Sequence, residues 1–273
     1  MKGIIFSGDR QLELREFAEP RPGVSEVVIQ MEASGLCGSD FRTYRTPRSE
    51  RGDLAQLKAG GHEPCGRVIE VGPGVRNLKV GDRIMVHHYL GCGRCRWCQV
   101  GYSQMCIDPA AKKLYYGRTN HGGHAERIAV HETACVPMPE GLSYEEGAAC
   151  ACGTGTAYDA IKRLDLSGRD TFAIYGQGPV GLSGTLFGAA TGARVIVVEP
   201  IAYRRELAKS LGCAVALDPR EGDPVEAIYG LTHGEGADAT LDCTGLPEPR
   251  TQSVRSTRIY GRACLVGEGG ETT

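Results

Sequence analysis

The sequence of 273 residues lacks the features that mark several common protein classes. It has no apolar run approaching the roughly eighteen residues of a membrane span. Its first ten residues, M-K-G-I-I-F-S-G-D-R, become polar too soon for a secretory signal peptide. No internal repeat and no low-complexity segment interrupt it. We therefore expect a cytoplasmic protein that does not bind membranes.

The sequence also lacks a charge excess of either sign, with 31 basic and 33 acidic residues. Such a balance leaves no basic footprint for nucleic acid or for an acidic membrane surface, and neither is expected as a partner. The length allows two domains. Cysteine is abundant, at 12 residues. Without a secretory signal, so many cysteines indicate metal ligation more than a disulfide framework.

A glycine-rich motif predicts a nucleotide-binding site in the second half of the chain. It follows the apolar run Thr171 to Tyr175, which has the length of a strand. In G-x-G-x-x-G after a strand, the first glycine allows a tight turn, the second lets the backbone approach a pyrophosphate, and the third lets the next helix pack closely. The pyrophosphate is expected at that helix's N-terminus. The residues concerned are Gly176, Gly178, Pro179, Val180 and Gly181.

An acidic residue about twenty positions further on strengthens this prediction, since a lone glycine triplet is weak. Residues 179–191 suit a helix, and Arg194 to Val198 suit a second buried strand. Glu199 then lies at the carboxyl end of that strand, where it is expected to accept from an adenosine ribose diol. The alternative is an ordinary solvated acid at a strand end.

The two halves of the chain have different patterns. The first half holds short β-type runs between Gly and Pro turns, which predicts a mainly antiparallel β-domain. Those runs are residues 3–6, 11–17, 26–31, 67–71 and 83–86. The second half alternates strands with helices, which predicts a doubly wound parallel sheet with further strands at 214–217, 239–242 and 263–266. We expect domains at residues 1–152 and 153–273.

Four cysteines close together predict a structural zinc site. Cys92, Cys95, Cys98 and Cys106 form a C-x2-C-x2-C-x7-C set. Four thiolates on one loop close a tetrahedron around Zn²⁺ and leave no open position. An iron–sulfur cluster is the competing interpretation, but the bacterial ferredoxin run has three residues before its last cysteine and a proline after it. Here seven residues precede it and Ile107 follows.

A second possible metal set is dispersed along the chain. Cys37 lies in G-L-C-G-S-D, His62 and Glu63 in G-G-H-E-P-C-G, and Cys152 in C-G-T-G-T-A-Y. Two thiolates and an imidazole with an open fourth position are typical of a catalytic zinc. Spacing alone cannot assemble the three ligands, because a single histidine or cysteine in a small-residue loop is more often structural.

Taken together, these motifs resemble the zinc-dependent medium-chain dehydrogenase family, which contains alcohol, sorbitol, butanediol and threonine dehydrogenases. Five motifs occur in the family's order and spacing across essentially the whole chain: G-L-C-G-S-D, G-H-E-P-C-G-R-V-I-E-V-G, the four-cysteine lobe, C-G-T-G-T-A-Y and G-Q-G-P-V-G. The resemblance implies a GroES-like β-domain that carries both zincs, a Rossmann domain, and an active site in the cleft between them.

The resemblance also implies residue roles. Cys37, His62 and Cys152 resemble the catalytic zinc ligands, and Glu63 the acid that can exchange into the zinc shell. Asp40 resembles the carboxylate that orients the ligating histidine, and Ser39 the hydroxyl that takes the alcohol proton. The wall against the nicotinamide ring is implied at Thr156, Thr244, Gly245, Val266 and Gly267.

Two positions depart from the family pattern. Many relatives have a histidine five residues after the first ligand, where this chain has Arg42, so the outer proton relay is unassigned. Sorbitol- and threonine-type members often have a glutamate where this chain has Cys152, which favours an alcohol-type site. The remaining cysteines match no ligand position and are expected to be small buried hydrophobes.

The expected function is hydride transfer between an alcohol or polyol and NAD, with carbonyl reduction in reverse. Zinc would lower the pKa of the bound hydroxyl and Ser39 would take its proton. A preference for NAD over NADP is expected from Glu199, but Arg204 and Arg205 could weaken it, because they can also bind the 2′-phosphate of NADP. The family's full-length members suggest a dimer or tetramer. The Rossmann sheet is expected to be incomplete at its C-terminal end. The alternative function is a non-catalytic protein or an inactive truncated fragment that keeps the fold and the structural zinc.

Overall fold

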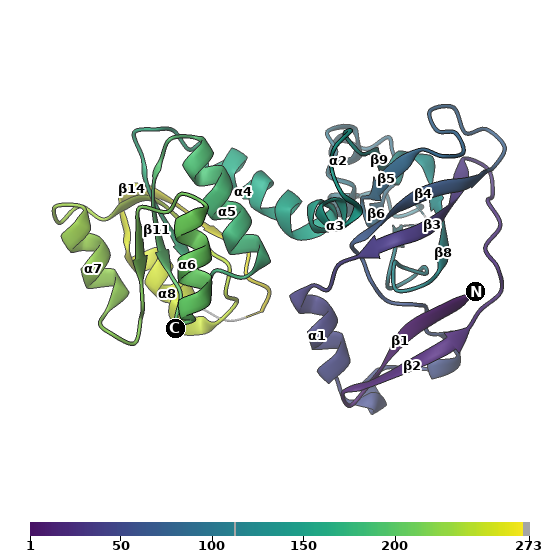
Figure 1. Cartoon of the computed structure of the whole chain (residues 1–273), viewed down its shortest axis with the longest axis horizontal. Helices are drawn as coiled ribbons and strands as arrows, with labels where there is room; N and C mark the ends of the chain where they lie inside the picture. The colour runs from purple at the N-terminus through teal and green to yellow at the C-terminus, as the bar shows by residue number, and fades with distance from the viewer. Residues whose placement is uncertain (112, 270–273) are drawn as a thin grey trace. The chain divides into compact units, whose positions relative to one another are not determined.

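A computed structural model of the chain describes residues 1–111 and 113–269. The chain divides into two compact units, Met1–Cys152 and Gly153–Thr273 (Figure 1). Within the described residues, no helix is both long enough and apolar enough to cross a membrane. The end of the chain at residues 271–273, where the Rossmann sheet is expected to be incomplete, lies outside the described residues.

Unit 1 is built on a five-stranded antiparallel sheet, which confirms the predicted antiparallel β-domain, although two of its strands, at 127–131 and 135–137, lie outside the predicted runs. The strand order is β8-β3-β4-β5-β9. The bounds are β3 Glu26–Ser34, β4 Pro64–Val71, β5 Arg83–Val86, β8 Arg127–His131 and β9 Cys135–Pro137. Its core consists of β-branched side chains from neighbouring strands, such as Val27, Val68, Ile84 and Ile128, around the fully buried ring of Tyr116.

Smaller elements surround this sheet. Two two-stranded sheets pair β1 with β2 and β6 with β7. Helices α1, α2 and α3 lie in the connections, and five residues after α3 form a π-helical turn. The bounds are β1 Lys2–Gly8, β2 Gln11–Glu16, β6 Tyr89–Leu90, β7 Leu114–Tyr115, α1 Gly38–Arg45, α2 Arg96–Gln99, α3 Tyr144–Ala149 and the π-helical turn Cys150–Thr154. Among these, α2 contains Cys98 and the π-helical turn contains Cys152, while Cys37 immediately precedes α1.

Unit 2 is a parallel five-stranded sheet in the order β12-β11-β10-β13-β14. The order reverses at β10, so the glycine-rich motif that follows β10 lies at the switch point of the sheet. The bounds are β10 Thr171–Tyr175, β11 Arg194–Val198, β12 Val215–Leu217, β13 Ala237–Asp242 and β14 Thr257–Leu265.

Helices cover both faces of this sheet. Because side chains alternate along a strand, Phe172 and Ile174 face α4, α5 and α6, whereas Ala173 and Tyr175 face α7 and α8. The bounds are α4 Gly155–Leu164, α5 Pro179–Ala190, α6 Ala202–Ser210, α7 Pro224–Leu231 and α8 Pro247–Arg255. The predicted doubly wound arrangement is confirmed.

Several strand boundaries differ from the prediction, the last strand by the most. The last strand begins at Thr257, six residues before the expected start, and ends at Leu265. Its early part, T-R-I-Y-G-R, lacks the apolar alternation that marks a strand, and Tyr260 there takes a positive φ of 58. Helix α4 ends at Leu164, because Asp165 takes the left-handed conformation at φ 48 and stops the helix.

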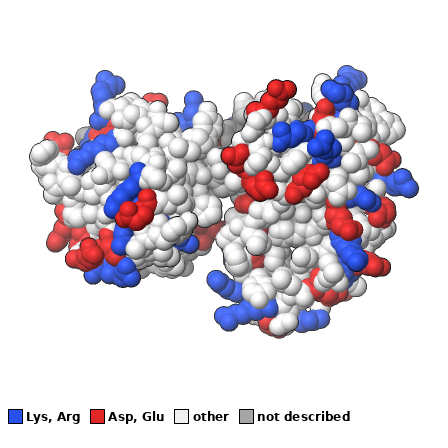
Figure 2. All heavy atoms as spheres, in the orientation of Figure 1, with Lys and Arg blue, Asp and Glu red and all other residues white. Residues whose placement is uncertain are grey.

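Charged side chains of both signs are interspersed on the face of each unit that Figure 2 shows, with no large area of one sign.

Candidate functional site

Four potential metal ligands from distant segments meet in unit 1. Cys37 immediately precedes α1, His62 and Glu63 immediately precede β4, and Cys152 lies in the π-helical turn. One ligand atom from each of the four side chains lies within 4.8 Å of the others. Two sulfurs, an imidazole and a carboxylate form a donor set that suits Zn²⁺.

A buried carboxylate holds His62 in one orientation. Asp40 Oδ1 lies 3.4 Å from His62 Nδ1, and Asp40 Oδ2 accepts a 2.9 Å hydrogen bond from the backbone N–H of Cys37. Asp40 therefore links two ligand segments. With Nδ1 facing Asp40, Nε2 is the nitrogen left for a metal.

The ligand side chains perturb one another strongly. A hydrogen bond from Cys152, with others from His62 and Ser39, lowers the pKa of Cys37 to about 3. Burial lowers the pKa of His62, but hydrogen bonds to Asp40 and Cys37 outweigh it and raise the pKa to about 10. Burial, with the charge of Cys37, raises the pKa of Glu63 to about 7. A cation at this position would relieve the crowding of acidic groups.

A glycine lies directly against this cluster. A Cβ atom on Gly35 would lie 1.7 Å from Glu63 Oε2, so any other residue at that position of the G-L-C-G-S-D motif would displace the Glu63 carboxylate. Ser39 is half-buried in the first turn of α1, and its side chain hydrogen-bonds to Cys37. The structure thus brings Ser39 and Asp40 together with the four potential ligands.

Aromatic rings that the sequence left unassigned pack around His62. The ring of His88 lies edge-on to it at 4.9 Å between centroids, and Tyr115 stacks on His88 at 5.3 Å. Burial lowers the pKa of His88 to about 3, so this ring is neutral. Only the run V-H-H-Y-L directly before the four-cysteine lobe gives a sequence signal for this group.

The four cysteines of the lobe are close enough to bind one ion. One Sγ atom from each of Cys92, Cys95, Cys98 and Cys106 lies within 4.8 Å of the others. Cys98 Sγ is 4.0 Å from Cys92 Sγ and 3.6 Å from Cys95 Sγ. A tetrahedron with Zn–S bonds of about 2.3 Å has S···S edges of roughly 3.8 Å, so the spacing fits zinc.

Backbone donors also point at these sulfurs. The N–H of Cys95 donates to Cys92 Sγ at 3.2 Å, and the N–H of Cys92 donates to Cys106 Sγ at 3.4 Å. Such bonds stabilise the thiolate form that metal binding needs. Of the described residues, these four and the Cys37 group are the sets of three or more His, Cys, Asp or Glu placed to share a metal.

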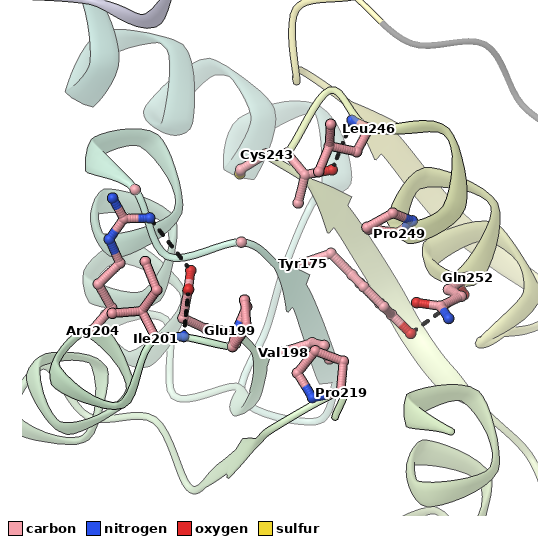
Figure 3. A pocket seen from close by; sticks show the side chains of 14 residues that line it. Tyr175, Val198, Glu199, Ile201, Arg204, Pro219, Cys243, Leu246, Pro249 and Gln252 are labelled. Atoms are coloured by element: carbon pink, nitrogen blue, oxygen red, sulfur yellow. Dashed lines mark hydrogen bonds and ion pairs between the residues drawn. The ribbon is translucent and has the colours of Figure 1, made fainter. Parts of the chain in front are cut away.

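Unit 2 contains a cavity of about 340 Å³ at the carboxyl ends of β10, β11 and β13 (Figure 3). Five of the predicted cofactor residues line it: Gly176, Gly178, Glu199, Arg204 and Thr244. The remaining lining is mostly apolar and includes Val198, Ile201, Cys243, Leu246 and Pro249. Mostly apolar walls with a few polar groups are typical of a small-molecule site.

The three glycines of the motif have three different environments. Gly176 has φ 87, a conformation that other residues rarely adopt. A Cβ on Gly178 would meet no atom within 4 Å, whereas one on Gly181 would lie 1.9 Å from Gly176 O. Pro179 and Val180, with Gly181, form the first turn of α5. The geometry thus matches a turn, an open backbone approach and a close helix contact.

Glu199 is only 2% exposed and holds the glycine-rich turn in place. Its Oε2 accepts the N–H of Gln177 at 2.7 Å, and its Oε1 accepts the N–H of Ile201 at 2.9 Å. Arg204 Nη1 is 3.8 Å from Oε2 and lines the cavity, as Figure 3 shows. Arg205 instead pairs with Asp218 at 3.0 Å.

The segments predicted to face the nicotinamide ring are partly assembled. A Cβ on Gly267 would lie 2.1 Å from the backbone nitrogen of Gly245, so those two segments touch. The backbone carbonyl of Asp242 accepts a 2.9 Å hydrogen bond from the N–H of Val266. Thr156 is exposed in the first turn of α4. Among the described residues, Thr156, Val266 and Gly267 do not line the cavity.

Two family profiles match the chain. One, described as an alcohol dehydrogenase GroES-like domain, covers residues 23–140. The other, described as a zinc-binding dehydrogenase, covers residues 179–273. Together they span both units.

Similar proteins have been named as dehydrogenases. An uncharacterized zinc-type alcohol dehydrogenase-like protein of Escherichia coli is 40% identical over 99% of this chain and 78% of its own length. The L-threonine 3-dehydrogenase of Pyrococcus abyssi is 34% identical over 93% of this chain and 72% of its own. A crystal structure of a zinc-binding dehydrogenase from Sinorhizobium meliloti, bound to NADP, superposes with a TM-score of 0.88 at 29% identity. It matches 100% of this chain and 79% of that one.

Proposed function

The chain belongs to the zinc-dependent medium-chain dehydrogenase family, and on that premise we propose that it transfers hydride between an alcohol or polyol and NAD. The observation that carries this proposal is the meeting of Cys37, His62 and Cys152 around one point of unit 1. A set of three ligands leaves a fourth position open for a substrate, which a purely structural zinc site does not.

Cys37, His62 and Cys152 would hold the catalytic zinc, and Glu63 is close enough to exchange with a ligand. When bound, zinc polarises the alcohol hydroxyl and lowers its pKa, and the nicotinamide accepts the hydride. Asp40 fixes the ring of His62 so that Nε2 stays aimed at the metal position. The burial of this group keeps bulk water from competing for its hydrogen bonds.

Ser39 would receive the proton of the alcohol. Its position in the first turn of α1 places its hydroxyl next to Cys37. Arg42 lies three residues further along the same helix, and residues at that spacing share a face. A guanidinium carries hydrogen-bond donors and no acceptor, so the proton would leave Ser39 without a side-chain relay at position 42.

Cys92, Cys95, Cys98 and Cys106 would hold a second zinc with a structural role, so we infer two zinc ions per chain. Four thiolates complete the coordination of this ion, and its binding free energy would stabilise the lobe.

The cofactor would be NAD rather than NADP. Glu199 presents a carboxylate at the end of β11, where it would accept from the adenosine ribose diol and repel a 2′-phosphate. Arg204 lines the same cavity but lies 3.8 Å from Glu199, so part of its charge is already compensated. Comparable catalytic efficiency with NAD and NADP would contradict this assignment.

The test is a screen of secondary alcohols, polyols and the corresponding ketones with NAD or NADH, on protein of measured zinc content. Cys152→Ala should abolish turnover and remove one zinc. Cys135→Ala provides a matched control, because that half-buried thiol lies outside both metal groups and its Sγ hydrogen-bonds only weakly, to His131 O at 3.6 Å. Full activity in Cys152→Ala would refute the proposal.

A further inference from the structure

The turn at residues 115–120 packs directly against the His62 end of the metal-ligand group. The carbonyl of Tyr115 accepts the N–H groups of Arg118 at 3.0 Å and Asn120 at 3.2 Å, which closes the turn. A Cβ on Gly117 would lie 3.1 Å from the backbone nitrogen of His62. Arg118 is the next residue, so its backbone is fixed beside a metal-ligand candidate.

The side chain of Arg118 lies over the ring of Tyr115. Its Cζ is 5.1 Å from the centre of that ring, and the Tyr115 ring centre is 6.3 Å from that of His62. The guanidinium is thus no farther from the His62 ring than these two distances combined. Arg118 is exposed, so its donors are available to a ligand.

A second arginine, Arg51, is anchored on a segment that also packs near His62. Arg51 is half-buried, and its Nε donates to the carbonyl of Phe6 at 3.0 Å. The ring of Phe6 in turn covers Gly60, two residues before His62. Burial, and then the positive charge of Arg118, lower the pKa of Arg51. A Cβ on Gly117, the neighbour of Arg118, would lie 2.8 Å from Gly61 O, so both arginines are anchored to segments that contact the Gly60–Gly61 pair.

In the described part of the chain, Arg51 and Arg118 have no carboxylate within ion-pair distance, whereas Arg94 pairs with Asp108 at 2.7 Å. Two cations on neighbouring segments, one of them half-buried, would be stabilised by an anion that binds both. The planar donors of arginine suit carboxylate and phosphate oxygens.

We propose that Arg51 and Arg118 form a subsite for an oxyanion group, carboxylate or phosphate, that the alcohol substrate carries at a distance from its reacting hydroxyl. The inference rests on the proposed function, because it assumes that the hydroxyl binds at Cys37, His62 and Cys152. It narrows the substrate class from alcohols in general to hydroxy acids and phosphorylated polyols.

The kinetic test compares matched neutral and anionic alcohols with NAD. One pair is sec-butanol and β-hydroxybutyrate, and the other is glycerol and α-glycerophosphate. For each pair, the readout is the ratio of kcat/KM for the anionic to the neutral member. Losing a charge-assisted hydrogen bond should lower that ratio by roughly 10- to 100-fold in Arg118→Gln. Arg118→Lys, which keeps the charge, should retain part of it.

If the ratio falls in Arg118→Gln for the first pair alone, the subsite binds a carboxylate. If it falls for the second pair alone, the subsite binds a phosphate, and a fall for both pairs supports a general oxyanion site. The control is Arg21→Gln, because Arg21 is 82% exposed and pairs with Glu70 at 3.7 Å. Ratios that are unchanged in both Arg118→Gln and Arg51→Gln, with unfolding temperatures like the parent protein, overturn the inference.

A binding measurement separates this inference from the proposed function. Calorimetry of the zinc-loaded protein with β-hydroxybutyrate and with inorganic phosphate, without NAD, should show binding that Arg118→Gln weakens. If these anions bind through Arg118 while no alcohol is oxidised, the proposed function fails and the anion subsite stands. If neutral alcohols are oxidised and neither anion binds, the subsite fails and the proposed function stands.

Discussion

Exchanging single glycines of the G-Q-G-P-V-G motif for alanine should separate folding from cofactor binding. A Cβ on Gly181 would lie 1.9 Å from Gly176 O and 2.9 Å from Gly176 C, both backbone atoms. A Cβ on Gly178 would meet nothing within 4 Å, and its φ of −76 suits any residue. The two substitutions are chemically identical and sit three residues apart.

The expected cost at Gly181 follows from these distances. A carbon and a carbonyl oxygen do not approach to 1.9 Å, so α5 must move by more than about 1 Å from the turn after β10. Overpacking that displaces backbone costs about 1–3 kcal/mol and occasionally more, and we expect about 3 kcal/mol for Gly181→Ala. Gly178→Ala should leave stability within about 0.5 kcal/mol of the parent. It should nevertheless weaken NADH binding at least about tenfold, because the methyl group occupies the pyrophosphate's path.

Urea unfolding and NADH titration of both variants would measure these effects. The control is Gly230→Ala in α7, where the added Cβ also meets open space and the helix gains stability. If Gly181→Ala unfolds at the parent's urea concentration, the close contact between α5 and the turn is wrong. If Gly178→Ala binds NADH as tightly as the parent, the pyrophosphate does not pass that glycine.

Three further predictions concern the metals, the cofactor acid and pH. Cys98→Ser should lower the unfolding temperature and the zinc content together, whereas Cys152→Ser should mainly lower turnover. Metal analysis, calorimetry and kinetics measure these three quantities. Equal effects of the two substitutions would contradict separate structural and catalytic roles. Glu199→Gln replaces one acceptor oxygen with an NH2 group against a backbone donor, so the NADH dissociation constant should rise roughly tenfold, and unchanged binding would count against the ribose contact. Hydrogen bonds from Arg220 lower the pKa of Asp218 in the folded state. The contribution of Asp218 to stability is therefore present above the usual aspartate pKa of about 3.9 and is lost as pH falls below it. In Asp218→Asn, the free energy of unfolding in urea should fall less between neutral and acid pH than in the parent protein. An unchanged pH dependence of that free energy would refute the prediction.

Local patterns allowed much of unit 2 and the zinc lobe to be predicted. The strand Thr171–Tyr175, the glycine turn and Glu199 lie within thirty residues, and the four lobe cysteines within fifteen, so their geometry follows from short-range chain constraints. The approach of the four Sγ atoms agrees with the spacing of those cysteines. Their binding of zinc stays a prediction.

The group of Cys37, His62 and Cys152 could not be derived in that way. Its members come from the start of α1, the residue pair before β4 and a π-helical turn, and only the tertiary fold brings them within 4.8 Å. A π-helical turn has no pattern in the residue types of C-A-C-G-T. The resemblance to a family supplied these ligands, whereas periodicity and spacing did not.

Contacts between side chains and backbone could not be predicted from the sequence either. The position of Arg118 beside His62 depends on the close packing of Gly117, and the absence of a carboxylate partner in the described residues is a property of the surface as a whole. Likewise, the sequence placed Glu199 at a strand end but gave no sign that both of its oxygens accept backbone N–H groups.

That double role of Glu199 links cofactor choice to the shape of the cofactor site. The carboxylate that would exclude a 2′-phosphate also fixes Gln177, the residue between the first two glycines of the motif, and Ile201 before α6. Replacing it with a smaller neutral residue to admit NADP leaves two N–H groups without their acceptor in a site only 2% exposed. The turn that is expected to cradle the pyrophosphate then loses its anchor, so both cofactors should bind less well. The preference between NAD and NADP would therefore depend on the same side chain that holds the glycine-rich turn. A variant that uses NADP well would need a second group to accept the backbone N–H of Gln177.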